Sequence, residues 1–187
     1  PRTIWIMVPH KVVDEVLKEI TTLLESGDTI IDGGNSPYKE SMRRHDELKE
    51  KGINFLDVGV SGGPSGARNG ACLMVGGEKE LFEKYEEFFG DLSVEGGHAY
   101  MGTSGAGHFV KMVHNGIEYG IMQLIAESYD VLKNVGEYSN EELAETFRHW
   151  NDGDDLKSFL IEITAQIFRT ADDKGKGELI DKIKDAA

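Results

Sequence analysis

The sequence predicts an α/β unit built on a parallel sheet, followed by the first helices of an all-α unit. Two observations predict this. Strand-like and helical patterns alternate in the first part of the chain, and from residue 107 onward the patterns are helical. Strands that alternate with helices favour right-handed crossovers and a parallel sheet. We assign residues 1–105 to the α/β unit and residues 106–187 to the helical unit.

The elements of the α/β unit follow from the spacing of apolar residues. Apolar runs at 4–8, 29–32 and 53–58 are typical of strands buried on both faces. Apolar residues spaced by three and four predict a helix over 12–24, and a polar helix follows over 38–51. Residues 59–77 are rich in glycine around a short strand at 73–75. A helix at 79–89 and a weaker strand at 94–101 complete the unit.

The helical unit is predicted to contain three helices. The first extends from residue 107 to about residue 133, interrupted only by two glycines. Ser139, followed by two glutamates, marks the start of the next, because carboxylates in a first turn favour a helix N-terminus. Helices are therefore expected at 141–150 and 156–168, separated by a polar turn.

Composition narrows the classes of function. The chain carries 20 Lys and Arg against 34 Asp and Glu, a net charge of −14, which argues against nucleic-acid and anionic-membrane partners. Its one cysteine, Cys72, excludes an internal disulfide framework and lies in an apolar stretch, so we expect it to be buried. We see neither a signal peptide nor an apolar run near the roughly 20 residues of a membrane span. A cytoplasmic location is expected.

A first candidate site is the segment Asp32-Gly33-Gly34-Asn35-Ser36. It follows a strand, and ligands of doubly wound sheets bind at the carboxyl ends of the strands. Two glycines allow backbone to approach a ligand closely. The same segment also fits a plain loop in which Asn35 and Ser36 cap the next helix. Position alone leaves both interpretations open.

A second candidate is the glycine-rich segment 61–67, which begins Ser61-Gly62-Gly63. Successive glycine amides can form a concave site for a carboxylate or a phosphate. The spacing differs from the G-x-G-x-x-G dinucleotide fingerprint. A tight turn without a ligand explains the pattern equally well.

The strongest candidate lies in the predicted helix over 107–133. Helical spacing places Lys111, His114, Asn115 and Glu118 on one face. The other side of the helix is apolar: Val110, Val113, Ile117, Ile121 and Leu124. A polar stripe is most often a solvated face. An amine, an imidazole, an amide and a carboxylate on an otherwise apolar helix instead favour a partly buried site, in which Lys and Glu can act as base and acid.

Together these segments resemble the 6-phosphogluconate dehydrogenase (decarboxylating) family. The shared motifs are Asp-Gly-Gly-Asn-Ser at 32–36, Gly-Val-Ser-Gly-Gly at 59–63, Gly-Ala-Arg at 66–68 and Leu-Met-x-Gly-Gly at 73–77. The most specific is Gly-Ala-Gly-His-Phe-Val-Lys-Met-Val-His-Asn-Gly-Ile-Glu-Tyr-Gly at 105–120, and Leu-x-Ser-Phe-Leu-Ile-Glu-Ile-Thr at 156–164 also matches. The resemblance covers essentially the whole chain, in order.

The resemblance implies oxidative decarboxylation of 6-phosphogluconate. Lys111 corresponds to the base that takes the proton of the substrate 3-hydroxyl, and Glu118 to the acid that protonates the enediol carbon. The implied substrate-binding residues are Ser61, Gly62, Gly63, His114, Asn115 and Tyr119. Asn35 and Val8 correspond to cofactor-binding positions. The implied cofactor is NADP, with NAD possible, no metal is required, and a homodimer is expected.

The resemblance also implies that the Rossmann-like sheet is incomplete. The first strand, the glycine-rich phosphate loop and the residue that reads the adenosine ribose have no counterpart in this sequence, nor do the later arginine and histidine that hold the substrate phosphate. We therefore expect a fragment that lacks the N-terminal cofactor loop and the C-terminal part, and that is inactive alone.

Two alternatives stay open. One is a related β-hydroxyacid dehydrogenase of the 3-hydroxyisobutyrate type. Such enzymes share the Ser-Gly-Gly loop and the lysine but generally carry Lys-x-x-x-Asn-Asn, so His114 and Glu118 favour the decarboxylating family. The other is a non-catalytic, truncated paralogue, which the missing ends support.

Overall fold

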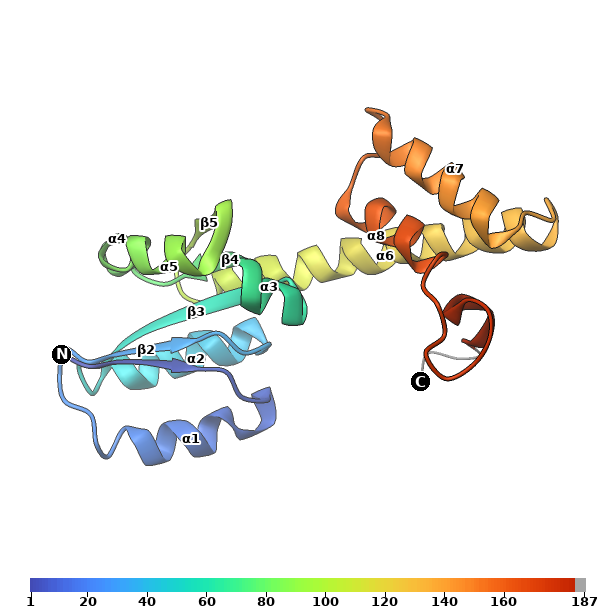
Figure 1. Ribbon diagram of the computed structural model, residues 1–187. Coiled ribbons are helices and arrows are strands. Elements are labelled where there is room, and N and C mark those ends of the chain that lie inside the picture. The colour runs from blue at the N-terminus through green and yellow to red at the C-terminus, as the bar shows by residue number, and fades with distance from the viewer. Residues whose placement is uncertain (184–187) are drawn as a thin grey trace. The chain divides into compact units, whose positions relative to one another are not determined.

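A computed structural model of the chain describes residues 1–183 (Figure 1). The chain divides into two compact units, Pro1–Gly116 and the remainder from Ile117 onward. The division falls within the long helix α6 (Ala106–Asn134), which occupies almost the range that its spacing predicts. Each unit has a hydrophobic core of its own.

The first unit is built on a five-stranded sheet with strand order β1-β2-β3-β4-β5. The strands are β1 (Thr3–Ile6), β2 (Thr29–Asp32), β3 (Asn54–Ser61), β4 (Ala71–Gly76) and β5 (Ser93–Gly102). The first three pair in parallel, as the alternation of strands and helices predicts. Rossmann-like α/β architecture followed by helices is thus confirmed.

The second half of the sheet differs from a purely parallel arrangement. β4 runs antiparallel to β3, and β5 runs parallel to β4. The connection between β3 and β4, residues 62–70, is shorter than the roughly dozen residues that a parallel crossover needs. Part of it forms the short helix α3 (Gly63–Asn69), where the glycine-rich pattern predicts a turn.

Helices complete the core of this unit. They are the 3-10 turn η1 (His10–Val12), α1 (Val13–Ile20), α2 (Tyr38–Lys49), α4 (Lys79–Lys84) and α5 (Glu86–Leu92). Phe55 packs in a cluster with residues of α1 and α2, whereas its neighbour Leu56 packs in a second cluster with residues of α4 and α5. Because successive strand residues point to opposite faces, β3 is buried on both sides, as its apolar run predicts.

Cys72 is exposed, so the expectation that it is buried is wrong. It lies in β4 opposite Ser61 of β3, between the buried residues Ala71 and Leu73. Cys72 is the second residue of β4, near the end of the strand, whereas Met74, on the same face, lies further into the strand and is buried.

The second unit contains the rest of α6, then α7 (Asn140–Asp152), α8 (Phe159–Ile167) and the 3-10 turn η2 (Leu179–Lys182). α7 begins with a capping box: Ser139 accepts a bond from the Glu142 amide, and the Glu142 carboxylate accepts one from the Ser139 amide. The core gathers Leu143, Phe147 and Phe168. No helix within residues 1–183 is long and apolar enough to cross a membrane.

Candidate functional site

The loops after β1 and β2 meet at the carboxyl ends of the parallel strands. Val8, half-buried, follows β1, and Asn35, exposed, follows β2. A Cβ placed on Gly34 would lie 2.8 Å from the Val8 carbonyl oxygen, so the two loops touch through their backbones. The two positions assigned to cofactor binding therefore lie on adjacent loops, at the edge where doubly wound sheets bind ligands.

Asp32 holds the loop that carries Asn35. Its buried carboxylate accepts a hydrogen bond from the Gly34 amide at 3.0 Å and another from the Ser36 hydroxyl at 2.8 Å. Ser36 thus binds Asp32, and α2 has no side-chain cap, so the interpretation of Asn35 and Ser36 as helix caps is wrong.

The paired glycines of this loop serve protein packing. A Cβ on Gly33 would lie 2.6 Å from the Met7 sulfur and 2.7 Å from the Trp5 ring. The Val8 carbonyl oxygen lies beside Gly34. Residues of β1 and of the loop after it therefore fill the space next to both glycines. Asn35, whose side chain is exposed, is the polar group of this loop that remains available to a ligand.

The glycine-rich loop after β3 is open to solvent. Ser61 ends β3 and is half-buried, while Gly62 and Gly63 are exposed. Both glycines have positive φ, 131° and 55°, a region that side chains rarely adopt. A Cβ on Gly63 would meet nothing within 4 Å, whereas one on Gly62 would lie 2.9 Å from the Gly66 Cα. The loop backbone is therefore accessible at Gly63.

Lys111 packs against the same strand. A Cβ placed on Gly59 would lie 2.5 Å from the Lys111 Cβ, so the lysine stem rests on the β3 backbone. Because alternate residues of a strand point to one face, Ser61 lies on the side of β3 that Gly59 turns toward α6. Within the first unit, the structure brings the Lys111 turn of α6 to the strand that leads into the Ser61 loop.

The other polar residues of α6 follow Lys111. His114 and Asn115 are half-buried, and the His114 Nδ1 lies 3.4 Å from the Asn115 Oδ1. Glu118 is also half-buried, and Tyr119 is 70% exposed. In the division of the chain, these last two residues belong to the second unit.

The polar stripe of α6 is more buried than the apolar side. Lys111, His114, Asn115 and Glu118 are half-buried, whereas Ile117 is 62% and Leu124 is 64% exposed. A merely solvated polar face would show the opposite pattern. These four polar residues are therefore partly covered rather than fully solvated.

Three buried polar residues at the first turn of α6 were not predicted from the sequence. Asp57, His108 and Ser41 are all buried, and they join β3, α6 and α2 through hydrogen bonds. The available signals were an acid inside an apolar strand pattern and a histidine one turn before Lys111.

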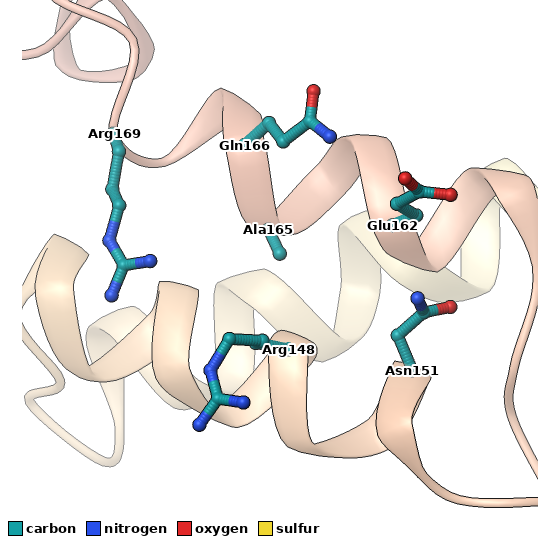
Figure 2. Close-up of a pocket in the computed structure, with 6 residues that line it drawn as sticks. All are labelled: Arg148, Asn151, Glu162, Ala165, Gln166 and Arg169. Atoms are coloured by element: carbon teal, nitrogen blue, oxygen red, sulfur yellow. The ribbon is translucent and has the colours of Figure 1, made fainter.

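A separate cleft of about 400 Å³ lies in the second unit, between α7 and α8 (Figure 2). It is lined by Arg148, Asn151, Glu162, Ala165, Gln166 and Arg169. Both arginines form ion pairs with Glu145, at 2.9 Å for Arg148 and 2.5 Å for Arg169. None of the candidate residues from the sequence lines this cleft.

Two family models match the chain. Residues 1–102 match the NAD binding domain of 6-phosphogluconate dehydrogenase, and residues 107–187 match the C-terminal domain of 6-phosphogluconate dehydrogenase. The fold and these matches define a two-unit class of protein, in which an α/β unit of the NAD binding domain type is followed by a helical unit. The chain belongs to the 6-phosphogluconate dehydrogenase family.

Individual relatives agree with this assignment. The decarboxylating 6-phosphogluconate dehydrogenase 1 of Spinacia oleracea is 52% identical over an alignment of 190 residues that covers 99% of this chain and 39% of that protein. An NAD(+)-dependent, decarboxylating 6-phosphogluconate dehydrogenase of Bacillus subtilis is 50% identical over an alignment of 190 residues that covers 99% of this chain and 40% of that protein. The chain thus spans about two fifths of the length of these relatives.

Solved structures show the same fold. The 6-phosphogluconate dehydrogenase of Plasmodium falciparum, described in apo form and in complexes with NADP+ and with 6-phosphogluconate, is 44% identical with a TM-score of 0.89. The match covers 98% of this chain and 40% of that one. A 3-hydroxyisobutyrate dehydrogenase of Mycobacterium tuberculosis, 19% identical with a TM-score of 0.71, shares the fold alone.

Proposed function

We propose that the protein carrying this chain oxidatively decarboxylates 6-phosphogluconate to ribulose 5-phosphate and carbon dioxide, with reduction of NADP or NAD. The observation that carries this proposal is the placement of Lys111 against Gly59, beside the strand that leads into the Ser61-Gly62-Gly63 loop. Relatives at about half identity are decarboxylating enzymes of this name. The NADP+ and substrate complexes of the Plasmodium relative support the same ligands here.

The residues of this chain divide the work of the reaction. Neutral Lys111 takes the proton of the substrate 3-hydroxyl as the hydride leaves the same carbon, which yields a β-keto acid. The protonated amine then returns its proton to the keto oxygen while the carboxylate leaves as carbon dioxide, so the bonding electrons form an enediol. Glu118 protonates the enediol carbon, and Lys111 accepts the hydroxyl proton as the ketone re-forms. Proton exchange with solvent resets both groups.

The remaining candidates hold the substrate. The amides of the exposed residues Gly62 and Gly63 can donate to an anionic or hydroxyl oxygen, and Ser61 adds a hydroxyl group. His114, Asn115 and Tyr119 offer further donors and acceptors along α6. Their part in the proposal is to orient the reacting carbon against Lys111, since proximity and orientation supply a large share of catalysis.

The loops after β1 and β2 fit a nicotinamide. Asn35 presents an exposed amide with both donor and acceptor groups, and the Val8 loop lies directly beside it. When bound, the oxidised nicotinamide supplies the hydride acceptor. Asn35 and Val8 would hold its ring against the substrate.

Substitution of the proposed base tests the function. We expect Lys111→Met in the whole protein to abolish turnover of 6-phosphogluconate, because no other group is assigned to take the hydroxyl proton. Far-UV circular dichroism and the urea unfolding midpoint should stay unchanged. Lys18→Met, which removes an exposed lysine of α1, is the control and should keep full activity. Substantial turnover by Lys111→Met would refute the assignment.

Glu118 has a separate expected signature. Glu118→Gln should slow release of carbon dioxide and formation of the pentose product more than it weakens substrate binding. Single-turnover measurement of NADPH formation and of carbon dioxide release separates the two steps. A change in substrate affinity alone would make Glu118 a contact residue.

The alternatives have direct tests. A β-hydroxyacid dehydrogenase of the 3-hydroxyisobutyrate type would oxidise 3-hydroxyisobutyrate faster than 6-phosphogluconate. A non-catalytic paralogue would turn over neither substrate as the whole protein. We expect the isolated 187-residue chain to have negligible dehydrogenase activity.

We also propose a homodimer and a cytoplasmic location for the whole protein, on the strength of the family resemblance. Analytical ultracentrifugation tests the first and cell fractionation the second. A monomer at micromolar concentration, or recovery outside the cytoplasmic fraction, would contradict them.

A further inference from the structure

A buried carboxylate joins β3 to the start of α6. Asp57 is fully buried, and its Oδ1 and Oδ2 accept hydrogen bonds from the Gly105 amide at 2.7 Å and the His108 amide at 2.9 Å. The first amides of a helix have no partners within the helix, and its N-terminus favours negative charge. Asp57 therefore caps α6 from a distant element, and α6 in turn stabilises a carboxylate that would otherwise be costly to bury.

Glycines let the helix begin in backbone contact with the sheet. Gly76 of β4 pairs with Asp57, and a Cβ there would lie 2.5 Å from the Gly107 amide nitrogen and 2.6 Å from Asp57 Oδ1. A Cβ on Gly107 would collide with the carbonyl oxygens of Asp57 and Met74. The start of α6 therefore cannot shift along the sheet without displacing these groups.

The first turn of α6 is also held from α2. The His108 side chain is buried, and its Nδ1 lies 2.7 Å from the Ser41 hydroxyl oxygen. His108 and Lys111 are three residues apart on α6, so they are neighbours along one side of the helix. Contacts that fix His108 therefore also fix the origin of the lysine side chain.

We propose that Asp57 is a positioning residue that sets the place of the Lys111 amine beside the Ser61 loop. Asp57 fixes the His108 turn, and Gly59, two residues further along the same face of β3, receives the Lys111 stem. The inference rests on the proposed role of Lys111 as base. It adds a residue that touches no reacting atom and acts through the start of α6.

Asp57→Asn in the whole protein tests the proposal. Asparagine keeps the shape but sets an NH2 group against one of the two amides, so the first turn of α6 must shift. We expect kcat to fall about tenfold or more, since small misplacements of a catalytic group are costly, while the KM for 6-phosphogluconate changes less than about threefold. Hydrogen exchange of residues 105–111 should rise.

Asp28→Asn is a matched control. Asp28 is also buried and accepts two backbone hydrogen bonds, from the Arg2 amide at 2.6 Å and the Glu25 amide at 2.9 Å. It precedes β2, at the end of that strand opposite to Asp32. We expect a comparable drop in the unfolding midpoint with kcat within about twofold of the parent. Equal losses of kcat in both variants would show a merely structural role and overturn the proposal.

A milder variant keeps the test decisive if Asp57→Asn does not fold. Ser41→Ala removes the partner of His108 Nδ1 and should lower kcat about threefold at nearly unchanged KM, whereas unchanged kcat would refute the inference. Failure of the proposed function can be distinguished from failure of the positioning role. An active Lys111→Met refutes the base, whereas an inactive Lys111→Met with parental kcat in the Asp57 or Ser41 variant refutes only the positioning role.

Discussion

Buried charged side chains stabilise the loop at the edge of the sheet where the proposed site lies. The Arg44 side chain is 2% exposed, its Nε donates to Asp14 at 2.7 Å, and its Nη1 lies 3.5 Å from the Asp32 carboxylate. Asp32 in turn holds the loop of Asn35. The ion pairs of Arg44 thus link α1, α2 and the loop after β2. The hydrogen bond from Arg44 lowers the pKa of Asp14.

Asp14→Asn should therefore cost stability in a pH-dependent way. Because the pKa of Asp14 is lowered in the folded state, its contribution is complete above the ordinary value of 3.8 and is lost as the pH falls through the folded-state value. We expect a loss of about 1 kcal/mol at pH 7, modest because Asp14 is half exposed, that shrinks below pH 4. Urea unfolding at several pH values measures it.

Glu15→Gln, an exposed neighbour in the first turn of α1, is the control for the same change of charge. It should shift the free energy of unfolding only slightly at either pH. A deficit of Asp14→Asn that stays constant down to pH 2 would contradict the assigned ionisation.

The spacing of residues explains which candidate site residues could be predicted from the sequence. Lys111, His114, Asn115 and Glu118 repeat at helical intervals in a long apolar segment, and the repeat alone places them on one face of α6. Asp57 has no such signature. Its partners are the amides of residues 105 and 108, and backbone partners leave no trace in residue identity.

At the scale of elements, β3 and α6 fit one another residue by residue. Asp57, Gly59 and Ser61 alternate along one face of β3, and His108 and Lys111 recur along α6. Asp57 meets the His108 turn, and Gly59 meets Lys111. The bounds of α6 were close to prediction because apolar periodicity is strong there, whereas β3 continues to Ser61, three residues beyond the predicted end of the strand. The direction of β4 depends on the length of a connection, which apolar periodicity does not report.

Gly59→Ala should push α6 away from β3. The added Cβ would lie 2.5 Å from the Lys111 Cβ and 2.9 Å from the Gly107 carbonyl oxygen, and the latter is backbone that cannot yield cheaply. We expect a loss of about 2 kcal/mol in the free energy of unfolding together with a fall in kcat. Urea unfolding and steady-state kinetics of the whole protein measure both.

The control is Gly90→Ala, in helix α5. There the nearest atom to an added Cβ is His98 Cε1 at 3.6 Å, an ordinary contact. Alanine favours a helix over glycine, so neutral or slightly raised stability and unchanged kcat are expected. Parental stability and kcat in Gly59→Ala would mean that α6 does not rest on β3 in solution.

At the scale of the whole chain, the two units carry separate cores. Phe55 is buried in the first unit, and Phe147 is buried in the second between the Trp150 and Phe168 rings, with centroids 4.6 Å and 5.2 Å away. The separation was predictable because the strand patterns stop before residue 107. The sequence assignment placed the boundary before α6, whereas the structure divides the chain within that helix, at Gly116, one of the two glycines that interrupt its pattern.

Cavity variants should therefore act locally. Phe147→Ala should cost roughly 4 kcal/mol within the second unit and raise hydrogen exchange over residues 140–168, with β2 and β3 unaffected. Phe55→Ala should show the reverse. Mass spectrometry of exchanged peptides from the whole protein reads both patterns, and a rise throughout both units in either variant would contradict separate cores.

Because β3 and α6 are in direct contact, the number of residues between Asp57 and Ser61 matters more than which residues they are. Deleting one residue between Asp57 and Ser61 would turn every later side chain of the strand to the opposite face, whereas most substitutions would disturb one position. Changes of chain length should therefore be excluded from the strand that carries Asp57, Gly59 and Ser61.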